Sequence, residues 1–237
     1  MTGDKMIAKS KRLTRGVILF MLLIFPVSAA AAKHVVVIDP GHGGSDMGVT
    51  LSRSVHEKDV TLAVARFVRE NLSRVNDIKI RLTRLDDRDV STTNRKKLEE
   101  KSNADLFISL HVNAGFGLNA KGYEIYYPVS DIPSAKKSSS GEILKDMTQT
   151  RYLNSCVRFA QIVQKNMGRV LPREGRGLIN APVLVLQSME APAVLLEIGF
   201  ATNIENKNKL KDKKFQEVVA DALTKSIKEY FSTGEAS

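Results

Sequence analysis

The chain has 237 residues, of which 43% are hydrophobic and 26% are charged, and its formal net charge is +10 at pH 7. This composition is that of an ordinary globular protein and excludes a largely disordered or collagen-like chain. The single cysteine excludes an intramolecular disulfide framework and a cysteine-rich zinc site. The length suits one sizeable domain or two small ones.

Residues 1–32 have the three-part order of a secretory signal peptide. Five basic residues and one acidic residue precede position 16, an apolar run occupies residues 16–27, and serine and alanine follow. The apolar run is short for a bilayer span, so an uncleaved membrane anchor is the weaker alternative. We therefore expect export to the periplasm or the medium, a mature chain of residues 33–237, and no stable membrane span after cleavage.

Removal of the signal also changes what the charge implies about partners. Loss of five positive charges and one negative charge lowers the net charge from +10 to +6, so four of the ten net charges belong to the signal. No nucleic-acid-binding motif accompanies the remainder, and we expect no nucleic-acid partner. A mildly basic mature protein suits an anionic polymer outside the cytoplasm.

Beyond residue 33 the hydrophobic pattern alternates between strands and helices. The predicted strands are short apolar runs at residues 34–39, 79–83, 105–112, 122–128, 183–187 and 193–200. The predicted helices are amphipathic segments at residues 57–72, 151–168 and 215–230, with a more polar helix at 91–103. This alternation predicts an α/β fold, with one domain built on a twisted, mostly parallel or mixed sheet flanked by helices.

Residues 129–150 interrupt the alternation. They are polar and serine-rich with a weak helical centre, and they precede a helix that we expect to begin near Arg151. A loop of this length inside a compact domain is usually functional or disordered. The segment is therefore interpreted as an inserted loop or a regulatory segment.

His42 is the first candidate for chemistry. It lies in the sequence DPGHGG at residues 39–44, directly after the first predicted strand. The pattern is neither a P-loop nor a dinucleotide-binding fingerprint. Ligand sites of open α/β sheets lie at the carboxyl ends of strands, and imidazole is the commonest metal ligand. Taken alone, however, a single histidine is more often a hydrogen-bonded structural residue.

Glu57 has a structural interpretation of its own. Ser54 and Glu57 have the spacing of a capping box in front of the apolar helical pattern. The segment is not the zinc motif H-E-x-x-H, because position 60 is Val and His56 has no histidine four residues later. By pattern alone, helix capping is favoured over metal ligation.

Two further residues lie in apolar strands. His111 closes the run LFISLH, and Glu197 lies inside PAVLLEIGF. An unpaired carboxylate in such a strand is costly, so Glu197 needs either a functional role or an ion pair with a neighbouring arginine. Together with His42 and Glu57, these residues form a coherent set, since two histidines and one glutamate are a known catalytic zinc ligand set that leaves a second glutamate as base.

Several pieces of the chain match one family in order. They are IDPGHGGSDMG at 38–48, HEKDVTLAVA at 56–65, RLTRLDD at 81–87, Arg95, ADLFISLHVNA at 104–114, GYEIYY at 122–127 and PAVLLEIGFATN at 192–203. On these residues the chain resembles the zinc-dependent N-acetylmuramoyl-L-alanine amidases, the group that includes the bacterial cell-separation amidases.

The resemblance implies a peptidoglycan hydrolase that cleaves the amide bond between N-acetylmuramic acid and the L-alanine of the stem peptide. It implies a six-stranded sheet, a Zn²⁺ cofactor with His42, Glu57 and His111 as ligands, and Glu197 as the catalytic glutamate. Asp39 and backbone carbonyls are candidate acceptors for the remaining histidine nitrogens. Two alternatives stay open: a zinc peptidase acting on the stem peptide, and a wall-binding module without catalysis.

The resemblance also bears on residues 129–150. In cell-separation amidases this region can carry a helix that blocks the zinc until a partner protein displaces it. The implied arrangement is an activator protein acting on this segment, with Glu142 reaching toward the metal and one or two helical turns around Ile143, Leu144 and Met147 lying on the domain. The alternative is a surface loop without a regulatory role.

Overall fold

The computed structural model describes residues 33–115, 117–129, 140–187 and 189–233. The proposed signal peptide, residues 1–32, lies outside these ranges. The compact unit that carries the described residues spans Ala31–Ser237. Within the described ranges, no helix combines the length and the apolar character that crossing a membrane requires.

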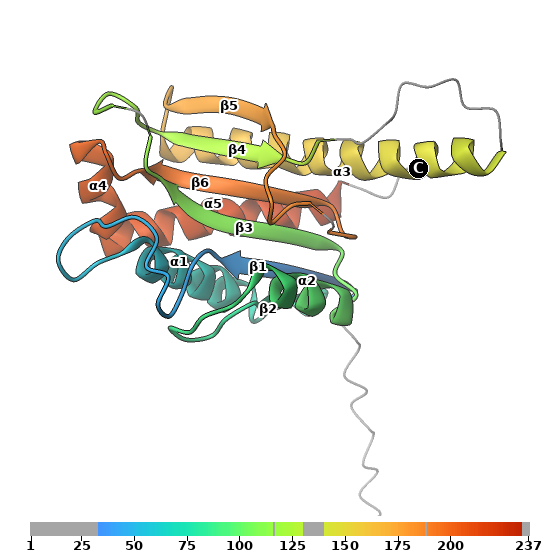
Figure 1. Ribbon diagram of the computed structural model, residues 1–237, viewed down its shortest axis with the longest axis horizontal. Coiled ribbons are helices and arrows are strands. Elements are labelled where there is room, and N and C mark those ends of the chain that lie inside the picture. The colour runs from blue at the N-terminus through green and yellow to red at the C-terminus, as the bar shows by residue number, and fades with distance from the viewer. Residues whose placement is uncertain (1–32, 116, 130–139, 188, 234–237) are drawn as a thin grey trace, which may run out of the picture. The chain divides into compact units, whose positions relative to one another are not determined.

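Six strands form one mixed sheet in the order β2-β1-β3-β6-β4-β5 (Figure 1). They are β1 His34–Pro40, β2 Ile78–Leu82, β3 Leu106–Asn113, β4 Tyr123–Tyr127, β5 Gly175–Asn180 and β6 Ala193–Phe200. The first four strands in this order are parallel to one another, whereas β4 pairs antiparallel with β6 and parallel with β5. The predicted α/β class and the six-stranded mixed sheet are therefore confirmed.

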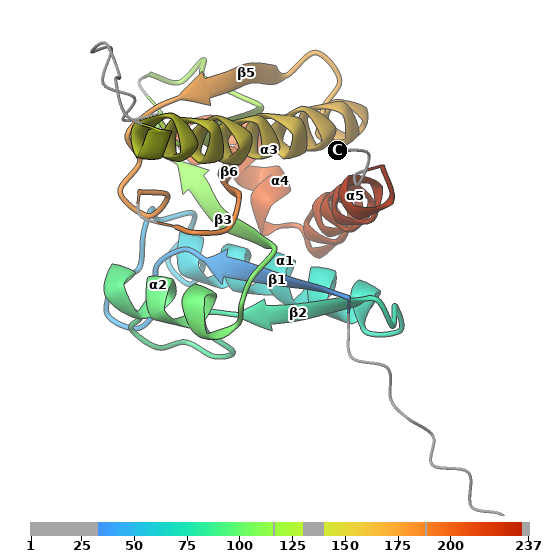
Figure 2. The same ribbon diagram turned by 90° about the vertical axis from the view of Figure 1, so that its right-hand side faces the viewer.

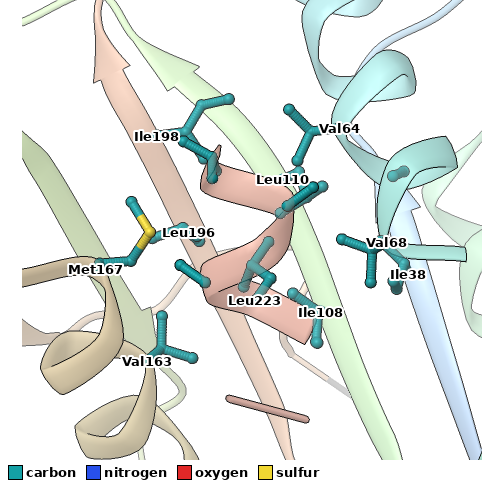
Figure 3. Close-up of a cluster of buried hydrophobic side chains, with 14 of the residues drawn as sticks. Ile38, Val64, Val68, Ile108, Leu110, Val163, Met167, Leu196, Ile198 and Leu223 are labelled. Carbon is teal, nitrogen blue, oxygen red and sulfur yellow. The ribbon is translucent and has the colours of Figure 1, made fainter. Parts of the chain in front are cut away.

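Helices cover both faces of the sheet. The five helices of the described chain are α1 Glu57–Leu72, α2 Thr92–Lys101, α3 Ser140–Val170, α4 Ile204–Lys211 and α5 Lys213–Ser232. Side chains from α1, α3 and α5 interlock with one face of the strands, as Figure 3 shows for Val68, Met167 and Leu223. Figure 2 shows α2 on the other side of the strands from α5.

The alternation of side chains along β1 explains why this strand is an unbroken apolar run. Val36 and Ile38 belong to the core beneath α1 and α5, whereas Val37 belongs to a smaller apolar cluster with Phe107 and Leu195 on the opposite face. A strand that is covered on both faces has no solvent side that would call for polar residues. The same argument explains the predicted strands of β3 and β6.

Near the carboxyl-terminal half, one predicted strand is wrong and one strand of the sheet was not predicted. Residues 183–187 form a hydrogen-bonded turn rather than a strand, and Leu186 in that turn closes the smaller apolar cluster. The sixth strand is instead β5, at the edge of the sheet, whose residues are exposed or half-buried. An edge strand buries little apolar surface, so its hydrophobic pattern is weak.

The helices differ from the prediction in three respects: one boundary, one additional helix and one capping residue. The helix expected near Arg151 begins at Ser140, so part of the 129–150 segment is the amino-terminal end of α3, while residues 130–139 and the Glu142 side chain lie outside the described residues. The short helix α4 was not predicted. Ser54 does not cap α1: His56 is the N-cap residue, and its backbone N–H donates to Asp59 at 2.8 Å.

Candidate metal centre

Three of the four predicted site residues converge on one point. His42 follows β1, Glu57 is the first residue of α1, and His111 lies in β3. His42 Nε2 lies 3.1 Å and His111 Nδ1 2.9 Å from Glu57 Oε1. The three potential ligand atoms all lie within 4.8 Å of one another. Two imidazole nitrogens and one carboxylate oxygen at this separation fit a Zn²⁺ ion.

Glycines leave the space in which these ligands meet. A Cβ atom at Gly41 would lie 2.4 Å from the His111 ring, and one at Gly48 would lie 2.5 Å from Glu57 Oε2. Gly48 also has a φ of 63°, in the left-handed region that favours glycine. Gly41 and Gly48 are therefore required for the close approach of the backbone to His111 and Glu57, and Gly48 also for its backbone conformation.

Glu57 is held as a carboxylate by donors from two elements. Its Oε2 accepts from Val49 N at 2.9 Å, and its Oε1 accepts from Val112 N at 2.9 Å. Burial opposes its ionisation, but the hydrogen bonds from His111 and His42 outweigh burial and lower the pKa of Glu57 to about 2. The same contact with Glu57, helped by Asp46, raises the pKa of His42 to about 9 against the effect of burial.

A buried arginine ties the His42 loop to the start of α1. The side chain of Arg84 is fully buried and donates to the carbonyl oxygens of Pro40 at 3.1 Å, Gly41 at 3.0 Å and Lys58 at 2.7 Å. These carbonyls flank His42 on one segment and Glu57 on the other. Arg84 therefore fixes the positions of the segments that carry His42 and Glu57 relative to one another.

Asp39 does not serve as the acceptor for a ligand histidine. Its carboxylate instead pairs with Arg95 and accepts hydrogen bonds from Thr83 Oγ1 and Ser109 Oγ, at 2.5 and 2.9 Å. The remaining nitrogen of His42, Nδ1, lies 2.8 Å from Asp46 Oδ2. The suggested role for Asp39 is therefore wrong: it braces β1 against its neighbours, and Asp46 is the carboxylate that lies beside His42.

Glu197 lies beside the three converging residues. It is the register partner of His111 on the neighbouring parallel strand, so the two side chains lie on the same face. Within the described part of the chain, Glu197 Oε2 has no hydrogen-bond partner and no arginine forms an ion pair with this residue. Burial, followed by the charges of Glu57 and Glu124, raises its pKa to about 8.

The structure adds a pair of residues that the sequence interpretation assigned no role. Glu124 is the register partner of Glu197 on β4, and its Oε1 accepts from Arg176 Nε of β5 at 2.9 Å. Its Oε2 accepts from Asn113 Nδ2 and Tyr126 OH, both at 2.8 Å. A charged residue inside the apolar strand YEIYY is the same kind of signal that singled out Glu197.

The fold and the site together define an α/β domain with a candidate metal centre and a buried carboxyl group beside it. Residues 36–229 match the Amidase_3 family model, described as N-acetylmuramoyl-L-alanine amidase. The chain belongs to this family of peptidoglycan amidases.

Named relatives agree with this family. The chain is 28% identical over 222 residues to the amidase AmiC of Escherichia coli O6:H1, covering 84% of this chain and 53% of AmiC. It is 29% identical over 225 residues to AmiA of Escherichia coli K12, covering 85% of this chain and 78% of AmiA. The chain thus spans about half the length of AmiC and about three quarters of AmiA.

Solved structures with the same fold are also amidases. The catalytic domain of CwlV from Bacillus (Paenibacillus) polymyxa superposes with a TM-score of 0.71 at 30% identity, covering 85% of this chain and 99% of that chain. The CwlD amidase of Clostridioides difficile, solved in complex with the GerS lipoprotein, has a TM-score of 0.70 at 25% identity. The match covers 85% of this chain and 100% of the CwlD chain.

Proposed function

We propose that this chain is a zinc-dependent amidase that cleaves the bond between N-acetylmuramic acid and the L-alanine of the peptidoglycan stem peptide. The observation that carries the proposal is the convergence of His42, Glu57 and His111 within 4.8 Å, with Glu197 on the same face of the sheet. Membership of the amidase family supports the choice of substrate.

His42, Glu57 and His111 would hold the metal ion. When bound, Zn²⁺ supplies Lewis-acid polarisation of the scissile carbonyl and lowers the pKa of a water molecule toward about 7. The two backbone N–H groups on Glu57 keep its carboxylate turned toward the histidines. The brace at Arg84 holds the loop and the helix that carry two of the ligands, so the site is organised before substrate arrives.

Glu197 would move the proton. Its Oε2 lacks a partner in the described structure, so it is free to accept a proton from the attacking water and to deliver that proton to the departing alanine nitrogen. A pKa of about 8 in the metal-free protein means that the buried site tolerates the protonated form that this transfer requires. General acid–base catalysis of this kind accounts for a factor of roughly 10²–10⁴ in rate.

Digestion of purified peptidoglycan tests the reaction. An amidase releases intact stem peptides and leaves intact glycan strands, and mass spectrometry identifies both products. Fragments of the stem peptide would identify a zinc peptidase instead. Binding to peptidoglycan without release of either product would identify a wall-binding module.

Elemental analysis tests the metal assignment. We expect one zinc per chain and its loss in His111→Ala, because two protein ligands rarely hold zinc in a catalytic site. His34→Gln is the matched control, since His34 stacks on Phe231 and is not among the converging ligands. Stoichiometric zinc in the His111 variant would contradict the assignment.

We also propose that the chain is exported with cleavage near Lys33. The support is the basic, apolar and small-residue order of residues 1–32, together with relatives named as probable cell wall amidases. Amino-terminal sequencing of periplasmic and medium fractions measures this directly. Full-length chain in the cytoplasm, with Met1 retained, would contradict it.

A partner protein acting on residues 129–150 is a further proposal. Ile143, Leu144 and Met147 lie on α3 with exposed fractions of 50%, 65% and 61%, so these turns do not pack on the domain as the sequence suggested. In Figure 1 this end of α3 runs past the strands. The solved CwlD–GerS complex supports a protein partner for this family. Replacement of residues 131–148 by a Gly-Ser linker should raise the rate of peptidoglycan release if the segment is inhibitory; an unchanged rate would contradict that role.

A further inference from the structure

Four neighbouring strands each contribute one polar side chain to a single row on the sheet. The row consists of His111 on β3, Glu197 on β6, Glu124 on β4 and Arg176 on β5. His111 and Glu197 are register partners, as are Glu197 and Glu124, so these side chains lie on one face. The hydrogen bond from Arg176 to Glu124 brings the guanidinium to the same face.

Arg176 is the cation at the end of this row, and only one edge of its guanidinium is engaged. Its Nε donates to Glu124 at 2.9 Å, and its side chain is 49% exposed. Within the described part of the chain, no hydrogen bond from its two terminal nitrogens is found. The planar guanidinium is therefore held in one orientation with its outer fork open to solvent, and that fork matches a carboxylate.

Glu124 is itself firmly held, which makes it a fixed anchor for Arg176. It is 7% exposed, and Asn113 and Tyr126 occupy its second oxygen. The Phe200 ring lies beneath the guanidinium, with its centroid 5.4 Å from the Arg176 Cζ atom. An arginine fixed in this way loses little conformational entropy when it binds a ligand.

The spacing along the row agrees with the spacing of groups in the substrate. Directly opposed residues on paired strands have Cβ atoms about 4.5–5.5 Å apart, and each further strand adds about 4.8 Å. The open fork of Arg176 thus lies roughly one to two strand spacings from Glu197.

In the stem peptide, the residue after the leaving alanine is a glutamate joined through its γ-carboxyl group. Its α-carboxyl group lies within about 7 Å of the scissile nitrogen, the reach of two extended residues.

We propose that the open fork of Arg176, oriented by Glu124, binds the free α-carboxylate of the second stem-peptide residue and positions the scissile bond beside Glu197. This rests on the proposed amidase function and specifies which form of the substrate the site accepts. Arg176 is the cation that lies against the Glu124 carboxylate, next to Glu197 in the row, and it offsets the repulsion that Glu124 would otherwise exert on a substrate carboxylate. A wall in which this carboxylate is amidated would be a poor substrate.

The test compares two synthetic muropeptides that differ only in a carboxylate or a carboxamide at this position. We expect the wild-type enzyme to prefer the carboxylate by about 10- to 100-fold in kcat/KM, the range of a charge-assisted hydrogen-bonded pair. Arg176→Met should reduce the preference to near unity, and Arg176→Lys should retain part of it, because lysine keeps the charge but lacks the fork. Arg169→Met, an exposed arginine at the carboxyl end of α3, is the control and should keep the full preference.

The ratio of the kcat/KM values for the two muropeptides distinguishes loss of carboxylate recognition from damage to the fold. Misfolding lowers both rates together and leaves the ratio unchanged. Calorimetric binding of the two dipeptides, alanyl-γ-glutamate and its α-amide, to the wild-type chain gives a readout that needs no hydrolysis. Selective binding without hydrolysis would overturn the proposed reaction and leave this inference standing. Equal hydrolysis of both muropeptides by the wild type, or an undiminished preference in Arg176→Met, would overturn the inference.

Discussion

The Glu197 carboxyl group combines two properties that are costly in a structural residue: it is largely buried, and its Oε2 is unpaired in the described structure. Substitution by glutamine removes the proposed proton acceptor and nearly preserves the shape of the side chain. We predict that Glu197→Gln keeps its zinc and its unfolding midpoint while kcat falls by about 10²–10⁴-fold. Kinetics on purified peptidoglycan measure the decrease in kcat, and elemental analysis measures the zinc content.

The control for that variant is Glu70→Gln, which removes a carboxylate from the exposed face of α1. Its activity should match the wild type. If Glu197→Gln turned over within a few-fold of the wild type, Glu197 would have no part in the proton transfer.

His42 and Glu197 also predict how zinc affinity depends on pH. Zinc binds neutral imidazole, and the pKa of His42 is raised to about 9, chiefly by its hydrogen bond to Glu57, so below that pH binding displaces a proton. The pKa of Glu197 is raised to about 8, chiefly by burial, and a nearby cation favours its ionised form. The apparent affinity should therefore rise with pH, by about tenfold per unit for each proton displaced.

Chelator competition at pH 6, 7 and 8 measures the increase in the logarithm of the zinc affinity per pH unit, which equals the number of protons displaced. We expect a value between one and two protons in the wild type, and a value near one in Glu197→Gln, which has no carboxyl proton to release. An affinity that is flat over this range would show that His42 is already neutral in the metal-free protein.

Single residues also show where sequence reasoning succeeds and fails. His111 and Glu197 stand out because polar side chains in apolar strands need a reason. Pattern alone favoured Glu57 as a helix cap, and only the family resemblance indicated a ligand. In the structure Asp59 carries the capping bond, which leaves the Glu57 carboxylate turned to the histidines. Arg176 was missed because a lone arginine in a glycine-rich edge strand has no distinguishing pattern.

At the scale of elements, the loop after β1 must bring its backbone close to α1. Gly48 has a φ of 63° and no room for a Cβ atom beside Glu57, whereas Gly117 has a φ of 82° with open space around it. Both alanine variants should lose about 1–2 kcal/mol of stability from left-handed strain. We predict that only Gly48→Ala also weakens zinc binding, by at least about tenfold, since the ligand carboxylate must move.

Denaturant unfolding of the two variants measures the cost of the left-handed backbone strain. Chelator competition measures the effect of the contact between the new Cβ atom and Glu57 on zinc affinity. Because the backbone conformations match, the difference in zinc affinity between them reports the contact alone. Equal zinc affinities would show that Glu57 tolerates the displacement.

The elements that sequence predicted best are those buried on both faces. β1, β3 and β6 are mainly apolar, because each is covered by helices on one side and by the smaller cluster on the other. Residues 183–187 are similarly apolar without pairing in the sheet, because Val183, Val185 and Leu186 pack on the smaller cluster from a turn. A hydrophobic run therefore predicts that a segment is buried. It does not predict whether the segment is a strand or a turn, because that depends on hydrogen-bond partners elsewhere in the chain.

For the molecule as a whole, the proposed metal would join three segments that are far apart in sequence. A ligand that binds the folded chain alone stabilises it by about 4 kcal/mol when its concentration is 1,000 times its Kd. For a domain of this size that corresponds to roughly 8–16 °C in Tm. We predict a decrease in this range when a chelator is added to the wild type, measured by calorimetry, and no response to chelator in His111→Ala. A wild-type Tm indifferent to chelator would contradict a resident metal.

The place of β6 in the sheet has a consequence for the order of assembly. This strand comes last in the sequence yet lies between β3 and β4 (Figure 1). Until residues 193–200 have emerged and paired, β4 and β5 have no connection to the rest of the sheet, and the contacts that must form are long-range ones, which fold slowly. The same eight residues carry Glu197. A chain that ends before residues 193–200 therefore lacks both a central strand and the proposed proton acceptor, so we expect no peptidoglycan hydrolysis before the fold is complete.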